Sequence, residues 1–118
     1  MKNYTFVMRH LPHTSSRVQE ILDQMLTTAA FDQVVSVLFL DDGVLQLRRG
    51  QNPAEAVFKD TAAIFKVLEL YDINRLFVER ESLAARGLSD EDLLLPVQLV
   101  SRSEVGELLK TSDVVVPD

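Results

Sequence analysis

The 118-residue chain contains no cysteine. Without a thiol it can form no disulfide, no thiolate zinc site and no iron–sulfur cluster, and it has no thiol nucleophile. Long apolar runs are also missing. No stretch approaches the roughly 20 residues of a membrane span, and residues 1–10 lack the hydrophobic region of a signal peptide. We therefore expect a cytoplasmic protein that does not enter the membrane.

Positive charge is also in short supply. Lysine and arginine number 12 against 18 acidic residues, which gives a net charge of −6 and a pI near 4.8. Nucleic-acid binding usually needs a basic surface, so we expect no direct contact with nucleic acid. The length and the 47% hydrophobic content fit one soluble globular domain spanning residues 1–118.

The hydrophobic pattern alternates between strand and helix spacing along the chain. We expect strands at residues 4–8, 34–40, 76–78, 94–100 and 114–116, main helices at 17–30, 52–71 and 101–109, and short elements at 44–47, 82–86 and 89–92. The almost continuous apolar run 34–40 is typical of a strand covered on both faces, whereas Pro96 favours an edge position for its strand. This order predicts a single three-layer α/β/α domain of Rossmann or flavodoxin-like architecture, with a five-stranded, mainly parallel sheet.

The long helix predicted at residues 52–71 has more apolar surface than one core requires. Its apolar arc takes in Phe58 and Phe65 and covers about half of the circumference, whereas a stripe of about 100° suffices for a helix packed on one side. We therefore interpret Phe58 and Phe65 as candidate interface residues. Asp60 falls inside the same arc, and we interpret it as a buried, hydrogen-bonded structural acid, because an unpaired charge would be costly there.

The loop after the first predicted strand carries both histidines of the chain, His10 and His13. It lies where α/β sheets bind anions, and His13 with the hydroxyls of Thr14, Ser15 and Ser16 is a candidate anion site. The loop lacks glycine, and two histidines alone are a poor metal site, so a plain loop is the favoured alternative.

Two further positions have an ordinary structural interpretation. Asp41 and Asp42 could ligate Mg²⁺, but they precede Gly43, and Asp-Gly is a common turn signal. Ser82 lies outside any G-x-S-x-G elbow, and we expect it to cap a helix. No set of residues predicts a catalytic, metal or cofactor site, so we do not expect an enzyme.

Several short segments together resemble the DsrF-like, or TusC-type, members of the DsrE/DsrF/DsrH sulfur-relay family. The resemblance extends over nearly the whole chain in the family's order, although residues 89–103 match little and Thr14 stands where the family often has glycine. The segments that carry it are Pro12-His13, Asp42-Gly43-Val44, Gln46-Leu47, Gly50-Gln51 with Pro53, Phe65-Lys66, Leu70-Tyr71-Asp72-Ile73, Ser82-Leu83, Arg86-Gly87-Leu88 and Asp113-Val114.

The resemblance implies a non-catalytic structural subunit, without a cofactor, in a TusBCD-type complex built as a dimer of heterotrimers with TusB-like and TusD-like subunits. Such a complex receives persulfide sulfur from a TusA-like donor and passes it toward a TusE-like acceptor, for 2-thiouridine synthesis at the tRNA wobble position. The sulfur-carrying cysteine is expected on the TusD-type partner. Relatives can have cysteines near the third strand, but residues 76–82 of this chain contain none.

A second hypothesis comes from a different class of protein. The chain could be a free-standing small α/β protein that binds an anionic ligand or nucleotide at the loop 10–16. Purification separates the two, because a complex subunit elutes with two small α/β partners. A free-standing binder is a monomer or homo-oligomer whose melting temperature rises with its ligand.

Overall fold

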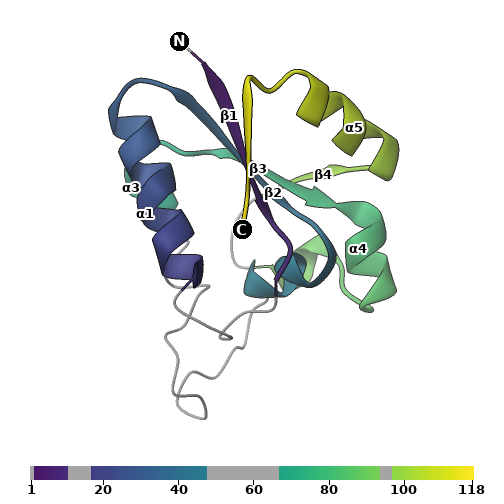
Figure 1. Cartoon of the computed structure of the whole chain (residues 1–118). Coiled ribbons are helices and arrows are strands. Elements are labelled where there is room, and N and C mark those ends of the chain that lie inside the picture. Colours follow the sequence, from purple (N-terminus) through teal and green to yellow (C-terminus); the bar gives the residue numbers. More distant parts are fainter. Residues whose placement is uncertain (1, 11–16, 48–66, 94–96) are drawn as a thin grey trace, which may run out of the picture.

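The computed structural model describes residues 2–10, 17–47, 67–93 and 97–118, and in them a five-stranded sheet (Figure 1). Its strands are β1 (Asn3–Met8), β2 (Val34–Phe39), β3 (Arg75–Glu79), β4 (Gln98–Val100) and β5 (Val114–Pro117), in the spatial order β4-β3-β2-β1-β5. All four neighbouring pairs are parallel. The predicted parallel α/β domain is thus confirmed, with β2 at the centre of the sheet.

The helices are placed by the direction in which the chain crosses the sheet. The connections from β1 to β2 and from β2 to β3 run in one direction, so right-handed crossovers put α1 (Arg17–Ala30) and α3 (Val67–Leu70) on the same face. The connection from β4 to β5 runs back across the sheet and puts α5 (Arg102–Lys110) on the opposite face (Figure 1). None of the described helices has the length and apolarity needed to cross a membrane.

Apolar side chains alternate between the two faces of the sheet and form two clusters. Under α1 and α3, Phe6, Val37 and Phe39 belong to the larger cluster, together with Ile21 and Met25 of α1. The smaller cluster under α5 consists of Val7, Leu38, Leu40, Phe77, Val100 and Val105. This alternation follows from the two-residue period of a strand. Every residue of β2 from Val35 to Phe39 is buried, as the sequence predicts for a strand covered on both faces.

The short elements lie at the carboxyl end of the sheet. A 3₁₀ segment (Asp41–Leu47) follows β2, α4 (Arg80–Ala85) follows β3 directly, and a second 3₁₀ segment (Asp90–Asp92) comes before β4. Gly87 ends the α4 region with a φ of 68°, which agrees with the predicted stop. The strand after them, β4, lies at the sheet edge as predicted, but its described part begins at Gln98.

The described end of the long predicted helix is α3 and the turn that follows it. Leu68 is buried in the larger cluster, and Asp72 follows the helix with a φ of 59°. Tyr71 is half exposed. It lies in the turn beyond the last helical residue, Leu70, where helical spacing no longer determines its direction. Residues 48–66 of this region lie outside the described part of the chain.

Candidate functional site

The carboxyl edge of the sheet is the part of this fold where a ligand is expected. In open α/β sheets, ligands bind where the connections after two neighbouring strands lead to opposite faces. Here β3 and β4 are such neighbours. The segment after β3 contributes Leu83 and Leu93 to the cluster under α1, whereas α5, which follows β4, packs on the other cluster. The residues at this point are Glu79, Ser82 and Arg102.

Glu79 and Ser82 are both buried, with exposed fractions of 5% and 2%. Ser82 Oγ donates a hydrogen bond to Glu79 Oε1 at 2.6 Å and accepts one from the backbone N–H of Asp41 at 2.9 Å. The hydroxyl therefore joins the end of β3 to the segment that follows β2. Its donor and one of its acceptor positions are occupied by the protein itself.

Arg102 closes the site from the α5 side. Its Nη2 lies 3.4 Å from Glu79 Oε1 and its Nε lies 3.5 Å from Oε2. The hydrogen bond with Glu79 and the negative charge of that carboxylate raise the pKa of Arg102. The backbone N–H of Arg102 donates to both carboxylate oxygens of Glu81, at 3.1 and 3.0 Å, and this hydrogen bond lowers the pKa of Glu81.

The exit of β1 is held by a buried carboxylate. The Asp118 side chain is only 4% exposed, and its Oδ1 lies 2.9 Å from His10 Nδ1. The backbone N–H groups of Arg9 and His10 donate to the same carboxylate, Arg9 at 3.1 Å and His10 at 3.3 Å. His10 is thus part of an internal contact. The other residues of the predicted anion site, His13, Thr14, Ser15 and Ser16, lie outside the described residues.

The predicted Asp-Gly turn follows β2. Asp42 pairs with Arg86 at 2.9 Å, and Asp41, which has a φ of 51°, lies 3.9 Å from Arg9 Nε. These arginine pairs supply the positive charge that a cation would otherwise provide. Within the described ranges, no three metal-ligating side chains come together.

Sequence reasoning placed Ser82 wrongly and missed its partners. Ser82 does not cap a helix, because α4 continues directly from β3 and begins at Arg80, so that Ser82 lies in its first turn. The contact of Glu79 with Arg102 was not predicted. The sequence did contain a signal, since Glu79 follows three apolar residues of the strand and must find hydrogen-bond partners when buried. Phe58, Asp60 and Phe65 lie outside the described residues.

This arrangement suits structural support better than chemistry. A nucleophilic serine needs an adjacent base and access to substrate. The hydroxyl of Ser82 is buried against a carboxylate that is itself held by Arg102. The described carboxyl edge is therefore a closed polar network that ties together the segments following β2, β3 and β4.

The fold and this edge can be compared with known proteins. The model of the DsrE/DsrF-like family matches residues 2–117. The chain belongs to the DsrE/DsrF-like family. It is 39% identical over 112 residues to the "Protein TusC homolog" of Vibrio vulnificus (strain CMCP6), covering 95% of each chain. It is 36% identical over 129 residues to the "Intracellular sulfur oxidation protein DsrF" of Allochromatium vinosum, covering 98% of this chain and 95% of the relative.

The crystal structure of the E. coli ychN protein has the same fold, with a TM-score of 0.83 over the full length of both chains at 17% identity. The resemblance seen in the sequence is thus confirmed at the level of the DsrE/DsrF-like family. Within this DsrE/DsrF-like fold, residues 76–82 form most of β3 and the start of α4, and they include Glu79 and Ser82 of the closed network.

Proposed function

We propose that this chain is a non-catalytic structural subunit of a TusBCD-type sulfurtransferase complex in the cytoplasm. Its partners are TusB-like and TusD-like subunits in a dimer of heterotrimers. The complex takes persulfide sulfur from a TusA-like donor and delivers it toward a TusE-like acceptor, for 2-thiouridine synthesis at the tRNA wobble position. The similarity to a TusC homolog along 95% of both chains carries the assignment to this subunit type.

The absence of cysteine supports the non-catalytic part of the proposal. In a persulfide relay a thiolate attacks the outer sulfur of the donor's persulfide, a new S–S bond forms, and the donor leaves as a thiolate. Each carrier therefore needs a cysteine. Neither serine nor histidine holds sulfane sulfur in this exchange, so the chain acts by stabilising or positioning the TusD-type partner that carries the cysteine.

The alternative, a free-standing protein that binds an anionic ligand or nucleotide at residues 10–16, has less support. The described start of this loop is the pair Arg9 and His10, whose backbone N–H groups already donate to Asp118. An internal carboxylate thus occupies donors that an anion would use.

The test is a transfer assay with purified subunits. The complex is incubated with a TusA-like donor loaded with radiolabelled persulfide sulfur, and the subunits are separated without reductant. We expect label on the TusD-type subunit and none on this chain. Omitting this chain should abolish or sharply reduce transfer to the TusE-like acceptor. Stable label on this polypeptide, or full transfer without it, contradicts the proposal.

A further inference from the structure

The edge strand β5 leaves one side of its backbone without a neighbouring strand in the described sheet. It pairs with β1 alone, in the register Tyr4↔Val114 to Val7↔Pro117. The N–H of Asp118 donates to Val7 O at 3.0 Å, so this N–H is directed toward β1. Because backbone groups of successive residues in a strand point to opposite sides, the N–H and C=O groups of Val114 and Val116 also point toward β1, and those of Val115 point away from it.

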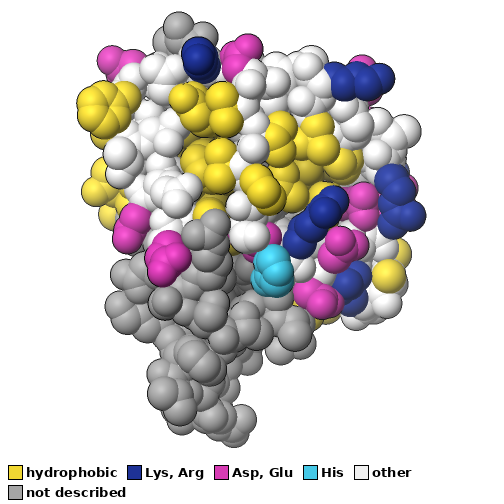
Figure 2. Space-filling view, in the orientation of Figure 1, with side chains coloured by type: hydrophobic (Ala, Val, Ile, Leu, Met, Phe, Trp, Pro, Cys, Tyr) yellow, Lys and Arg dark blue, Asp and Glu magenta, His cyan; other side chains and the backbone are white. Residues whose placement is uncertain are grey.

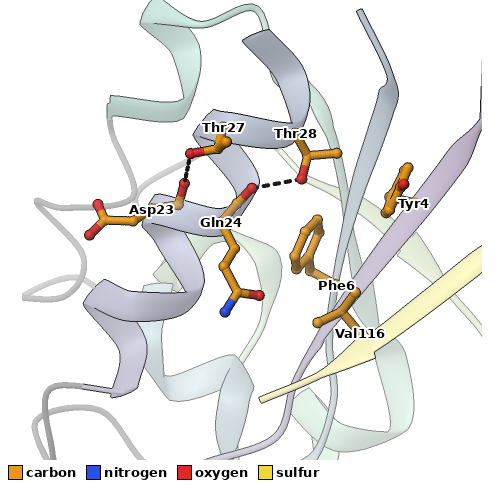
Figure 3. Close-up of a pocket in the computed structure, with 7 residues that line it drawn as sticks. All are labelled: Tyr4, Phe6, Asp23, Gln24, Thr27, Thr28 and Val116. Atoms are coloured by element: carbon orange, nitrogen blue, oxygen red, sulfur yellow. Dashed lines mark hydrogen bonds between the residues drawn. The ribbon is translucent and has the colours of Figure 1, made fainter. Parts of the chain in front are cut away.

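A groove runs beside this edge, between β5 and α1 (Figure 3). Its floor is apolar and consists of Tyr4, Phe6 and Val116, and its volume is about 350 Å³. The residues of its wall come from α1 and are Asp23, Gln24, Thr27 and Thr28. A second hollow shares Tyr4, Thr27 and Thr28 and continues to Phe31, which is 73% exposed.

Apolar surface is present on both sides of the edge. In Figure 2, hydrophobic side chains gather on either side of the band of backbone where β5 lies in Figure 1. On the side away from the groove, Val115 is 43% exposed. An added strand would therefore find apolar contacts for the side chains that it directs to each face of the sheet.

The wall of the groove offers hydrogen-bond acceptors. Thr27 Oγ1 donates to Asp23 O at 2.9 Å and Thr28 Oγ1 donates to Gln24 O at 2.7 Å (Figure 3). Both hydroxyl hydrogens are thus used inside α1, and the oxygens remain as acceptors. The exposed carboxylate of Asp23 makes no hydrogen bond or ion pair with another described residue. An apolar floor with an acceptor-rich, negatively charged wall fits the aliphatic stem and cationic head of a lysine or arginine.

We propose that β5 and this groove together bind an extended strand of a partner subunit. Backbone hydrogen bonds to Val115 add that strand to the sheet, and a lysine or arginine on its α1 side enters the groove and pairs with Asp23. The proposal rests on the proposed role as a complex subunit and specifies one surface and the chemistry of the segment that meets it.

A second copy of this chain fits the edge less well than a basic partner. Asp113 and Asp118 flank β5, and the chain carries a net charge of −6. If two copies paired through antiparallel β5 strands with Val114 opposite Val116, the Asp113 of one copy would lie next to the Asp118 of the other. Like charges at such positions are destabilising.

Amide hydrogen exchange in the assembled complex tests the pairing. The chain is compared alone and in complex with the TusB-like and TusD-like subunits. We expect exchange at Val115 to slow at least tenfold on assembly. Val116 is the internal control, because its N–H points toward β1 and is protected in both states. A complex in which Val115 exchanges as in the free chain overturns this inference and leaves the proposed function intact.

Charge reversal tests the groove. We expect Asp23→Lys to weaken assembly at least tenfold, whereas Glu107→Lys, the same change on an exposed position of α5, leaves it within twofold. Equal effects of the two variants overturn the inference. Failure of the wild-type chain to assemble with these partners overturns the proposed function and this inference with it. Self-association that protects Val115 in the isolated chain assigns the edge to a second copy and overturns the inference as well.

Discussion

At the scale of single residues, Ser82 connects three parts of the carboxyl edge. It lies in α4, donates to Glu79 at the end of β3 and accepts from the backbone of Asp41 after β2. Glu79 in turn contacts Arg102 at the start of α5. A buried donor or acceptor that loses its partner costs more free energy than an exposed one, because water cannot replace the lost bond. The network is therefore expected to matter for stability rather than for sulfur chemistry.

The first prediction is that Ser82→Ala lowers the free energy of unfolding by about 1–3 kcal/mol, because Asp41 loses an acceptor and buried Glu79 loses a donor. Urea unfolding of the isolated chain measures the change. Ser103→Ala, at an exposed position of α5, is the matched control and should stay within about 0.5 kcal/mol. Equal stability of wild type and Ser82→Ala would show that the hydroxyl contributes nothing to the fold.

At the scale of elements, the segment after β2 is positioned by close contact with β1. A Cβ at Gly43 would overlap the backbone oxygen of Met8, whereas a Cβ at Gly106 in α5 would meet no atom within 4 Å. Glycine is thus sterically required at position 43, whereas at position 106 it only lowers helix propensity.

We accordingly expect Gly43→Ala to cost about 3 kcal/mol or more, because the backbone of β1 and the 3₁₀ segment must separate. Gly106→Ala should stabilise the chain by about 0.5–1 kcal/mol. Both changes add one methyl group, and both are measured by urea unfolding. A small effect of Gly43→Ala would mean that the two segments are not in close contact.

The start of α5 is predicted to be sensitive to acid. Ser101 and Glu104 form a capping box, and the hydrogen bond from the backbone N–H of Ser101 lowers the pKa of Glu104. In the same way, the hydrogen bond from the backbone N–H of Arg102 lowers the pKa of Glu81. A carboxyl with a lower pKa in the folded than in the unfolded state stabilises the fold above its unfolded pKa. That contribution is lost as the pH falls through the pKa of the folded state, which lies below the ordinary glutamate pKa of about 4.3.

Thermal melting as a function of pH measures this effect. The double variant Glu81→Gln and Glu104→Gln should flatten the loss of melting temperature below about pH 4.3. Glu107→Gln is the control, since that carboxylate makes no hydrogen bond to a described residue, and it should leave the slope unchanged. A double variant with the wild-type slope would assign the acid sensitivity to other groups.

These elements also show how far the sequence determines the structure. Strand and helix positions were predictable because two-residue and 3.6-residue periods are local signals. The order β4-β3-β2-β1-β5 was not, since no local pattern states which strands become neighbours. The contact between Glu79 and Arg102 depends on that order and was missed for the same reason. Ser82 was mistaken for a cap because Glu79 turns directly into α4 with an extended φ and ψ of −69° and 121°, without a polar side-chain cap.

At the scale of the whole molecule, the net charge and the pairing of the arginines determine whether the chain attracts nucleic acid. Its net charge is −6, and three arginines of the carboxyl edge are paired with carboxylates: Arg9 with Asp41, Arg86 with Asp42 and Arg102 with Glu79. Affinity for nucleic acid comes mainly from lysine and arginine side chains that neutralise phosphates and release counterions. Arginines already paired with carboxylates contribute little to such an attraction.

The last prediction follows for a protein proposed to act in tRNA thiolation. The isolated chain should leave the fluorescence anisotropy of labelled tRNA unchanged at physiological salt, at protein concentrations up to about 10⁻⁴ M, the weak end of ordinary non-specific binding. Any contact of the pathway with tRNA would then belong to another protein, and this chain would act only through other subunits. The comparison is a variant in which Asp41 and Asp42 are replaced by asparagine and Glu79 by glutamine, so that the three arginines lose their charged partners. Circular dichroism must show that this variant is folded. Binding by the wild type that weakens steeply with added salt would show that basic side chains of this chain meet the tRNA backbone directly.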